Sequence, residues 1–197
     1  MGKKAALLID GGALRALCKQ NGRLIDDPNY IEKVALACFD SAEEDVFRIF
    51  YYDCAPYSGE LKLPVSRTSK VFKGNDSWQH QLAQKNFFAL RRGRLKFVDW
   101  ELKAPMAPGK TPSDADYAPK FQQKGVDMRI GLDMATLAAK GGVERVILLT
   151  ADTDFIPALK LVRTEGLQVV AVNLPGTRFN LEFLEHVDIK RPVAWPP

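Results

Sequence analysis

The sequence predicts an α/β protein with a central parallel sheet, strand order 3-2-1-4-5, and helices on both faces. Three observations support this. Short apolar runs alternate with helical patterns five times along the chain. Two of the runs, residues 4–9 and 143–150, are too short for helices and lead directly into aspartates. No internal repeat or low-complexity segment interrupts the alternation.

The first third of the chain supplies two strands and one helix. Residues 4–9 form the first apolar run, which ends at Asp10 and a glycine turn, Gly11-Gly12. The glycine spacing fits neither the dinucleotide-binding fingerprint nor a P-loop. Pro28 opens a helix with apolar residues at the spacing of one helical face. Residues 46–52 are aromatic and β-branched, which predicts the second strand.

The middle of the chain is richer in proline, glycine and cations. Residues 55–76 are predicted to be mostly loop, and Ser77 to cap a helix over 77–90. Arg91, Arg92 and Arg94 would follow its C-terminus, where cations complement the helix dipole. Residues 95–102 predict the third strand. Residues 103–124 contain four prolines and no hydrophobic period, so we expect a long mobile loop that borders the site.

The last third returns to regular alternation. A helix is predicted from about residue 127, the fourth strand over 143–150, a helix over 156–165 and the fifth strand over 167–173. A short helix is expected over 179–187. We therefore expect a single domain over residues 1–190 and a loose C-terminal tail over 191–197.

Composition narrows the class of protein. With 197 residues, 46% hydrophobic and 26% charged, the chain can bury a substantial core. Its three cysteines are far apart and only His80 and His186 are present, which argues against a zinc site or a Ser/His/Asp triad. The apolar run at the N-terminus stops too early for a signal peptide, and no stretch could cross a membrane. We expect a cytoplasmic protein without membrane association.

Charge is unevenly distributed. Residues 62–96 carry nine cations and one acidic residue, whereas the whole chain has a net charge of +4, so the remainder is net acidic. The basic segment is a candidate for contact with a polyanion. A charge run is more often simply a solvated surface with extended lysines, and this alternative stays open.

Two carboxylates one residue apart, Asp152 and Asp154, follow the fourth strand. Open α/β sheets place their sites beyond the carboxyl ends of the strands, at the switch point, and in the predicted order Asp10 would join them there. Carboxylates held about 4 Å apart repel by roughly 4 kcal/mol at an effective dielectric of 20. A Mg²⁺ or Mn²⁺ ion would offset that repulsion. An Asp-x-Asp sequence alone is more often a helix cap, so the prediction depends on other carboxylates converging.

Together the motifs resemble those of NYN domains, and specifically the LabA-like members of the PIN-like nuclease superfamily. The matching segments run in order through most of the chain: Leu8-Ile9-Asp10-Gly11-Gly12, Lys124-Gly125-Val126-Asp127 with Asp133-Met134, and Leu148-Leu149-Thr150-Ala151-Asp152-Thr153-Asp154-Phe155. The resemblance implies a PIN-like, Rossmann-like three-layer sandwich, an acidic Mg²⁺ or Mn²⁺ site, and RNA as substrate.

Carried over by position, the resemblance implies specific roles. The catalytic metal ligands would be Asp10, Asp127, Asp152 and Asp154, and the supporting residues Asp133 and Thr150. The sequence departs from the family pattern at Gly12, where many members have Asn, and at Ala151, where Gly is frequent. The change at position 12 bears on contacts to substrate or to water at the metal.

The leading functional hypothesis is a metal-dependent endoribonuclease that hydrolyses RNA phosphodiester bonds. Lys124, Arg91, Arg92 and Arg94 are candidates to bind the backbone of single-stranded RNA. Two alternatives stay open: a non-catalytic module that binds RNA or a protein, and a phosphatase or nucleotide-sugar enzyme that uses Asp-x-Asp. The sequence is compatible with a homodimer and does not define the natural substrate or the number of metal ions.

Overall fold

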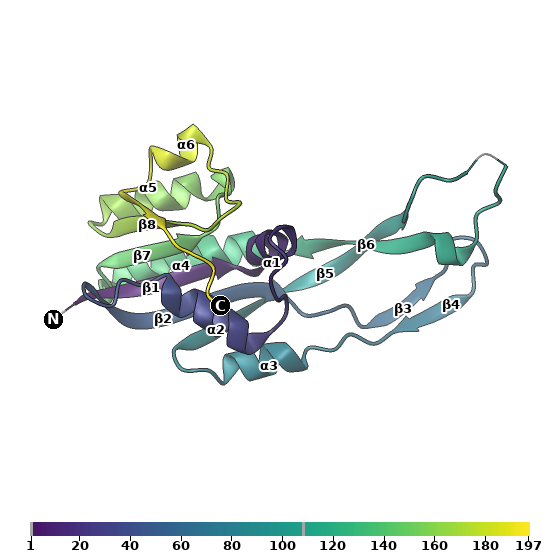
Figure 1. Cartoon of the computed structure of the whole chain (residues 1–197), viewed down its shortest axis with the longest axis horizontal. Helices are drawn as coiled ribbons and strands as arrows, with labels where there is room; N and C mark the ends of the chain where they lie inside the picture. Colours follow the sequence, from purple (N-terminus) through teal and green to yellow (C-terminus); the bar gives the residue numbers. More distant parts are fainter. Residues whose placement is uncertain (1, 108) are drawn as a thin grey trace.

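A computed structural model, which describes residues 2–107 and 109–197, has three layers with a seven-stranded sheet in the middle (Figure 1). The strand order is β6-β5-β2-β1-β7-β8-β9. The strands are β1 (Lys3–Asp10), β2 (Glu44–Cys54), β5 (Phe88–Leu102), β6 (Tyr117–Lys124), β7 (Arg145–Leu149), β8 (Gln168–Asn173) and β9 (Ile189–Pro192). All neighbours are parallel except β5 and β6. The predicted 3-2-1-4-5 order is confirmed as β5-β2-β1-β7-β8.

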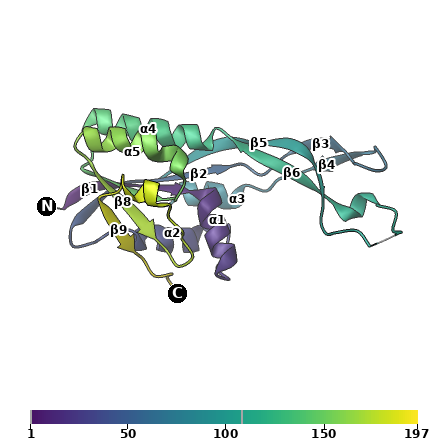
Figure 2. The same cartoon turned by 90° about the horizontal axis from the view of Figure 1, so that it is seen from above.

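Helices cover both faces of the sheet. Figure 2 shows α4 (Val126–Lys140) and α5 (Ile156–Thr164) on one face, and α1 (Gly11–Gln20) and α2 (Pro28–Ala37) on the other. Leu7 and Ile9 of β1 pack with the α1 and α2 side, whereas Ala6 and Leu8 pack with the α4 and α5 side. Both faces of β1 are therefore buried, which explains why this parallel strand is apolar throughout rather than alternating.

The segment predicted as a helix over residues 77–90 divides into two elements. Helix α3 (Ser77–Ala83) is short, and Phe87 then adopts a left-handed backbone with φ of 67°. Strand β5 begins at Phe88 and pairs with β2 from Ile49 onward. Pairing with the buried edge of β2 prevails over the helical pattern, so the prediction for residues 84–90 was wrong. Arg91, Arg92 and Arg94 consequently lie in a strand and not at a helix C-terminus.

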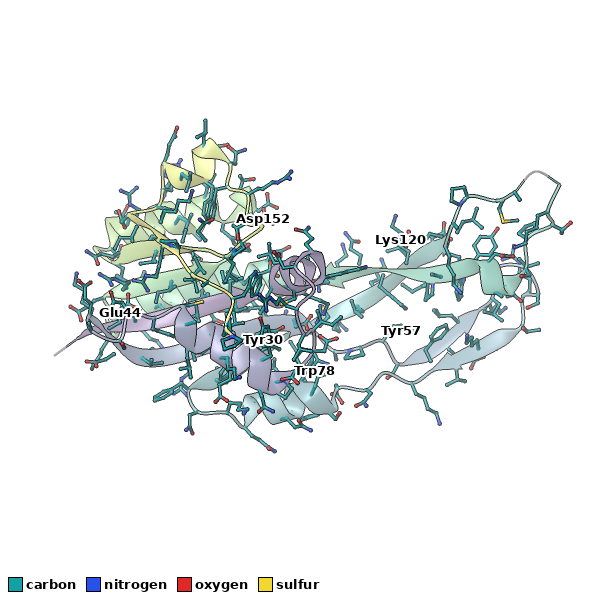
Figure 3. All side chains as sticks on the ribbon, in the orientation of Figure 1. Tyr30, Glu44, Tyr57, Trp78, Lys120 and Asp152 are labelled. Atoms are coloured by element: carbon teal, nitrogen blue, oxygen red, sulfur yellow. The ribbon has the colours of Figure 1, made fainter. Side chains whose placement is uncertain are left out.

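An arm extends from the body of the protein, formed by the distal parts of β5 and β6 and by the hairpin β3 (Gly59–Lys62) and β4 (Ser69–Phe72) (Figures 1 and 2). Aromatic side chains join the two hairpins of the arm: the Tyr57 and Phe121 ring centroids are 4.8 Å apart, and those of Phe72 in β4 and Trp100 in β5 are 6.3 Å apart. Figure 3 shows Tyr57 and Lys120 on this arm. The predictions of loops over residues 55–76 and 103–124 were wrong where these strands form.

The C-terminal segment is integrated into the fold. Helix α6 (Leu181–Leu184) is shorter than predicted, and β9 then pairs in parallel with β8. Arg191 and Pro192 belong to β9, and Val193 is buried at 8% exposure. The domain boundary expected at residue 190 thus falls inside a strand, and the segment 191–197 is not loose along its first part.

A buried ion network ties β9 to the other side of the sheet. Glu44, at the start of β2, accepts hydrogen bonds from Arg145 of β7 and, at 2.7 and 2.9 Å, from Arg191 of β9. The Glu44 side chain is 0% exposed and that of Arg145 2%. Burial by itself would raise the pKa of the Glu44 carboxyl, but the hydrogen bonds from Arg191 and Arg145 outweigh it and leave the pKa below its ordinary value.

In the described part of the chain, no helix has the length and apolarity of a membrane span.

Candidate functional site

Asp10 occupies the last position of β1 and caps α1. Its Oδ1 atom accepts hydrogen bonds from the backbone N–H groups of Gly12 at 2.9 Å and Ala13 at 3.1 Å. The helix begins at once, without the separate glycine turn that the sequence suggested. Gly11 is required for a different reason, because a Cβ there would lie 2.7 Å from the backbone oxygen of Tyr52 in β2. The close approach of α1 to β2 thereby fixes the position of Asp10.

Asp152 and Asp154 follow β7 in a short 3-10 turn, residues Thr153–Phe155. Oδ1 of Asp152 accepts from the Asp154 N–H at 2.9 Å, and Thr150 Oγ1 accepts from the Asp152 N–H at 3.3 Å. The capping role that the sequence left open is therefore present. Capping engages one oxygen of Asp152, and both Asp152 and Asp154 are exposed, so carboxylate oxygens remain accessible to solvent.

The carboxylates converge because β1 and β7 are neighbours, with Ile9 opposite Leu149. Figure 3 shows Asp152 at the edge of the sheet where α1 begins. Burial raises the pKa of the Asp10 carboxyl, its backbone hydrogen bonds lower it, and the charges of Asp127 and Asp152 raise it again. The net pKa is above the ordinary value. Three of the four predicted ligands thus interact electrostatically at the switch point of the sheet.

Asp127 and Asp154 line a common hollow beside α4 and α5. Asp127 lies in the first turn of α4, and both residues line a hollow of about 490 Å³ between the starts of α4 and α5. Asp133, one and a half turns further along α4, is differently engaged. Its Oδ2 accepts from Tyr52 Oη and from Arg91 Nε, both at 2.9 Å. Asp133 thus joins α4 to β2 and β5 and is a support rather than an open carboxylate.

The four predicted nucleic-acid-binding cations fall into two pairs. Arg91 is bound to Asp133, and Arg92 donates to Asp76 at 3.0 Å. Arg94 and Lys124 lie directly opposite each other on β5 and β6, both exposed. Neither forms an ion pair with any residue that the structure describes. Like charges in opposed positions destabilise a strand pair, so this pair has no evident benefit for folding.

Gln123 is a site residue that sequence reasoning missed. A Cβ at Gly12 would lie 3.2 Å from Asp10 Oδ1 and 3.4 Å from Gln123 Oε1. The root of the arm therefore places the Gln123 amide close to Asp10. The amide borders the space that a side chain at position 12 would occupy. Residues 117–124 have no regular apolar alternation, and Pro119 and the proline-rich segment before it gave no sequence signal of a strand. Trp78 packs edge-on against Tyr51, with ring centroids 6.1 Å apart, and so contributes to the core.

The donor set is compatible with a hydrated divalent cation. Within residues 2–107 and 109–197, no three His, Cys, Asp or Glu side chains are arranged as a ready-made metal site. Mg²⁺ commonly keeps several waters and takes only one or two carboxylates, together with phosphate oxygens of the substrate. Asp10 and Asp152 each have one oxygen outside the caps described above, and these oxygens are available to a cation or to its bound water. The residues present fit Mg²⁺ or Mn²⁺ bound in this manner.

The fold and the site together define an α/β domain with an acidic centre at the switch point of its sheet. The model of the NYN domain matches residues 4–185, and the chain belongs to this family, part of the PIN-like nuclease superfamily. A solved protein of unknown function from Vibrio parahaemolyticus RIMD 2210633 is similar with a TM-score of 0.55 and 19% identity, covering 98% of this chain and 93% of that one. This likeness concerns the fold alone. A comparison with curated proteins found no match.

Proposed function

We propose that the protein is a metal-dependent endoribonuclease of the LabA-like group of NYN proteins. The observation that supports the proposal is the adjacency of β1 and β7, at whose carboxyl ends Asp10 and Asp152 lie, in a chain of the NYN family. Carboxylates gathered where parallel strands end favour a hard cation over helix capping alone.

Asp10, Asp127, Asp152 and Asp154 would hold Mg²⁺ or Mn²⁺. A divalent cation bound there supplies the positive charge that polarises a phosphodiester and favours its hydrolysis by water. Thr150 fixes the backbone of Asp152 through its hydroxyl. Asp133, held by Tyr52 and Arg91, keeps α4 in place beside β2, so that Asp127 is presented to the site.

The RNA backbone is proposed to cross the root of the arm. Lys124 directly precedes Gly125, the N-cap of α4, and is three residues from Asp127. Arg94 lies opposite Lys124 on β5, so the two offer paired positive charge close to the start of α4. Gln123 adds an amide beside Asp10. Arg91 and Arg92, held in ion pairs, contribute positive potential to the same strand without full freedom to follow the phosphates.

The proposal is tested by incubating the purified protein with end-labelled single-stranded RNA and with DNA of the same sequence. Each is supplied with Mn²⁺, Mg²⁺ or a chelator. We expect internal cleavage of RNA with either metal and none with the chelator. Binding without products under every condition would replace the nuclease by the alternative of a non-catalytic RNA-binding module.

The role of the exposed cation pair can be measured apart from catalysis. In chelator, the double variant Arg94→Ala Lys124→Ala is expected to bind single-stranded RNA more weakly at low salt. Each lost phosphate contact should reduce the slope of log affinity against log salt by about 0.7. The control Arg48→Ala Lys140→Ala removes one arginine and one lysine from other exposed positions. Equal salt slopes for the two double variants would exclude Arg94 and Lys124 from the RNA interface.

A further inference from the structure

A cavity of about 510 Å³ lies next to the acidic centre, on the α1 side of the sheet. Its floor is formed by the ends of β7 and β8, where Leu149 and Val172 are each 2% exposed. The loop after β8 closes one side. This loop is fixed to α1 because Asn21 Nδ2 donates to the Pro175 carbonyl at 3.0 Å. The volume falls within the roughly 300–1,000 Å³ of small-molecule sites.

Helix α1 has a second face, which borders the cavity and of which Leu17 also packs against the core. Leu14 and Cys18 pack into the core, whereas another stripe lines the cavity: Ala13, Ala16, Leu17 and Gln20. Their spacing of three and four residues places them on one side of the helix. Alanine at two of these positions leaves the space open, and Leu17 gives it an apolar wall.

Polar groups occur at defined places around this apolar space. Thr177 lines the cavity, and its hydroxyl oxygen is buried without a hydrogen-bond partner among the described residues. An unpaired buried hydroxyl is costly and is usually matched by a partner. Arg178 is exposed at the rim. Thr150 and Ala151 line the cavity, and Asp152 follows Ala151 directly in the chain.

We propose that this cavity binds one nucleobase of the RNA, adjacent to the phosphate that lies at the carboxylates. The inference rests on the proposed nuclease function and specifies its substrate class. A nucleobase has two apolar faces and a polar edge. The faces match the aliphatic walls, and rotation of the Thr177 side chain on binding would turn its unpaired hydroxyl, which is covered in the free protein, toward the polar edge. Arg178 would meet the neighbouring phosphate. Because a base can enter such a cavity only when it is unstacked and unpaired, the substrate is single-stranded or has a flipped-out nucleotide.

The first test measures base binding without metal or cleavage. Adenosine and uridine are titrated into the full-length protein in chelator, with inorganic phosphate as a probe that lacks a base, and binding is followed by isothermal titration calorimetry. We expect both nucleosides to bind and phosphate not to. Ala16→Leu fills the cavity at an exposed helical position and should weaken nucleoside binding by about tenfold or more. Ala139→Leu, the same change at an exposed position of α4, should leave it unaltered.

A second variant separates binding from folding. Thr177→Val keeps the shape of the side chain and removes the unpaired hydroxyl. It should weaken nucleoside binding while the unfolding midpoint of the free protein stays the same or rises. Failure of the wild type to bind nucleosides, or equal binding by Ala16→Leu, would overturn the base site even if RNA is cleaved. Nucleoside binding lost in both variants would support it even if no RNA is cleaved.

The substrate class provides an independent outcome. With metal present, the wild type should cleave single-stranded RNA at least about tenfold faster than a fully paired duplex of the same sequence. Ala16→Leu should lose most of this activity, and Ala139→Leu should retain it. Cleavage of the blunt duplex at the rate of the single strand would contradict the inference while leaving the nuclease assignment in place.

Discussion

Asp10→Asn is expected to lower metal-dependent RNA cleavage by at least about a thousandfold and, at the same time, to make the metal-free protein more stable. The two effects have one cause. Burial and the charges of Asp127 and Asp152 raise the pKa of Asp10, so its negative charge is unfavourable in the folded state unless a cation compensates it. Asparagine removes the charge and can still accept the hydrogen bonds from Gly12 and Ala13, so the cap on α1 is retained.

Thermal unfolding in chelator and in Mn²⁺ measures the second effect. The wild type should gain stability when Mn²⁺ is added, because a ligand that binds only the folded state stabilises it. Asp10→Asn should start from a higher midpoint and gain little from the metal. The control Asp45→Asn makes the same change at an exposed position near the opposite end of the sheet and should behave as the wild type in both assays.

The combination is more informative than loss of activity alone. A variant that is inactive because it is misfolded would show a lower unfolding midpoint. A lower midpoint for Asp10→Asn in chelator would mean that the carboxylate mainly supports the fold. Full activity of Asp10→Asn would remove Asp10 from the metal site.

Glu44→Ala is expected to lower the free energy of unfolding by roughly 3–5 kcal/mol, the usual cost of breaking a buried ion pair on one side. The substitution leaves Arg145, whose side chain is 2% exposed, and Arg191 without their shared partner. Urea denaturation at pH 7 measures the change. Glu43→Ala is the matched control, because the Glu43 side chain is 66% exposed and its oxygen lies 3.7 Å from Arg145; its effect should stay within about 0.5 kcal/mol.

The effect of Glu44 should also depend on pH. Its pKa is lower in the folded protein than in the unfolded chain, so its ionised form stabilises the fold above the unfolded pKa and this contribution is lost as pH falls through the folded pKa. The difference in stability between wild type and Glu44→Ala should therefore be complete at neutral pH and shrink below roughly pH 4. A difference that stays constant down to pH 3 would show that packing, rather than charge, holds β9 to the sheet.

Several features of the fold could be predicted from the sequence because they depend on residues that are close together in the chain. The apolar segments at β1 and β7 are buried on both faces, so a short continuous run was sufficient to identify each as a parallel strand. In the predicted order 3-2-1-4-5 these two strands are neighbours, and Asp10 then approaches Asp152. The roles of these aspartates in metal binding stay predictions.

Other features could not be predicted because their partners are distant in sequence. Residues 84–90 carry a helical pattern, yet Phe88 belongs to β5 because β2 provides an edge to pair with. Strand β6 contains Pro119, which an edge strand tolerates but which removes the usual sequence signal of a strand. The same applies to Arg91, whose engagement with Asp133 depends on how β5 lies against α4.

The sequence by itself was sufficient to predict the class of fold, the order of the five central strands and the aspartates at their ends. Buried strands appear as runs of consecutive apolar residues, and the alternation of strands with helices can be followed along the chain. The tertiary structure alone decided that an arm leaves the sheet, that Gln123 lies beside Asp10, and that one face of α1 borders a cavity. These features arise from contacts between segments far apart in the chain, and the free energy of such contacts overrides local preference wherever the two disagree.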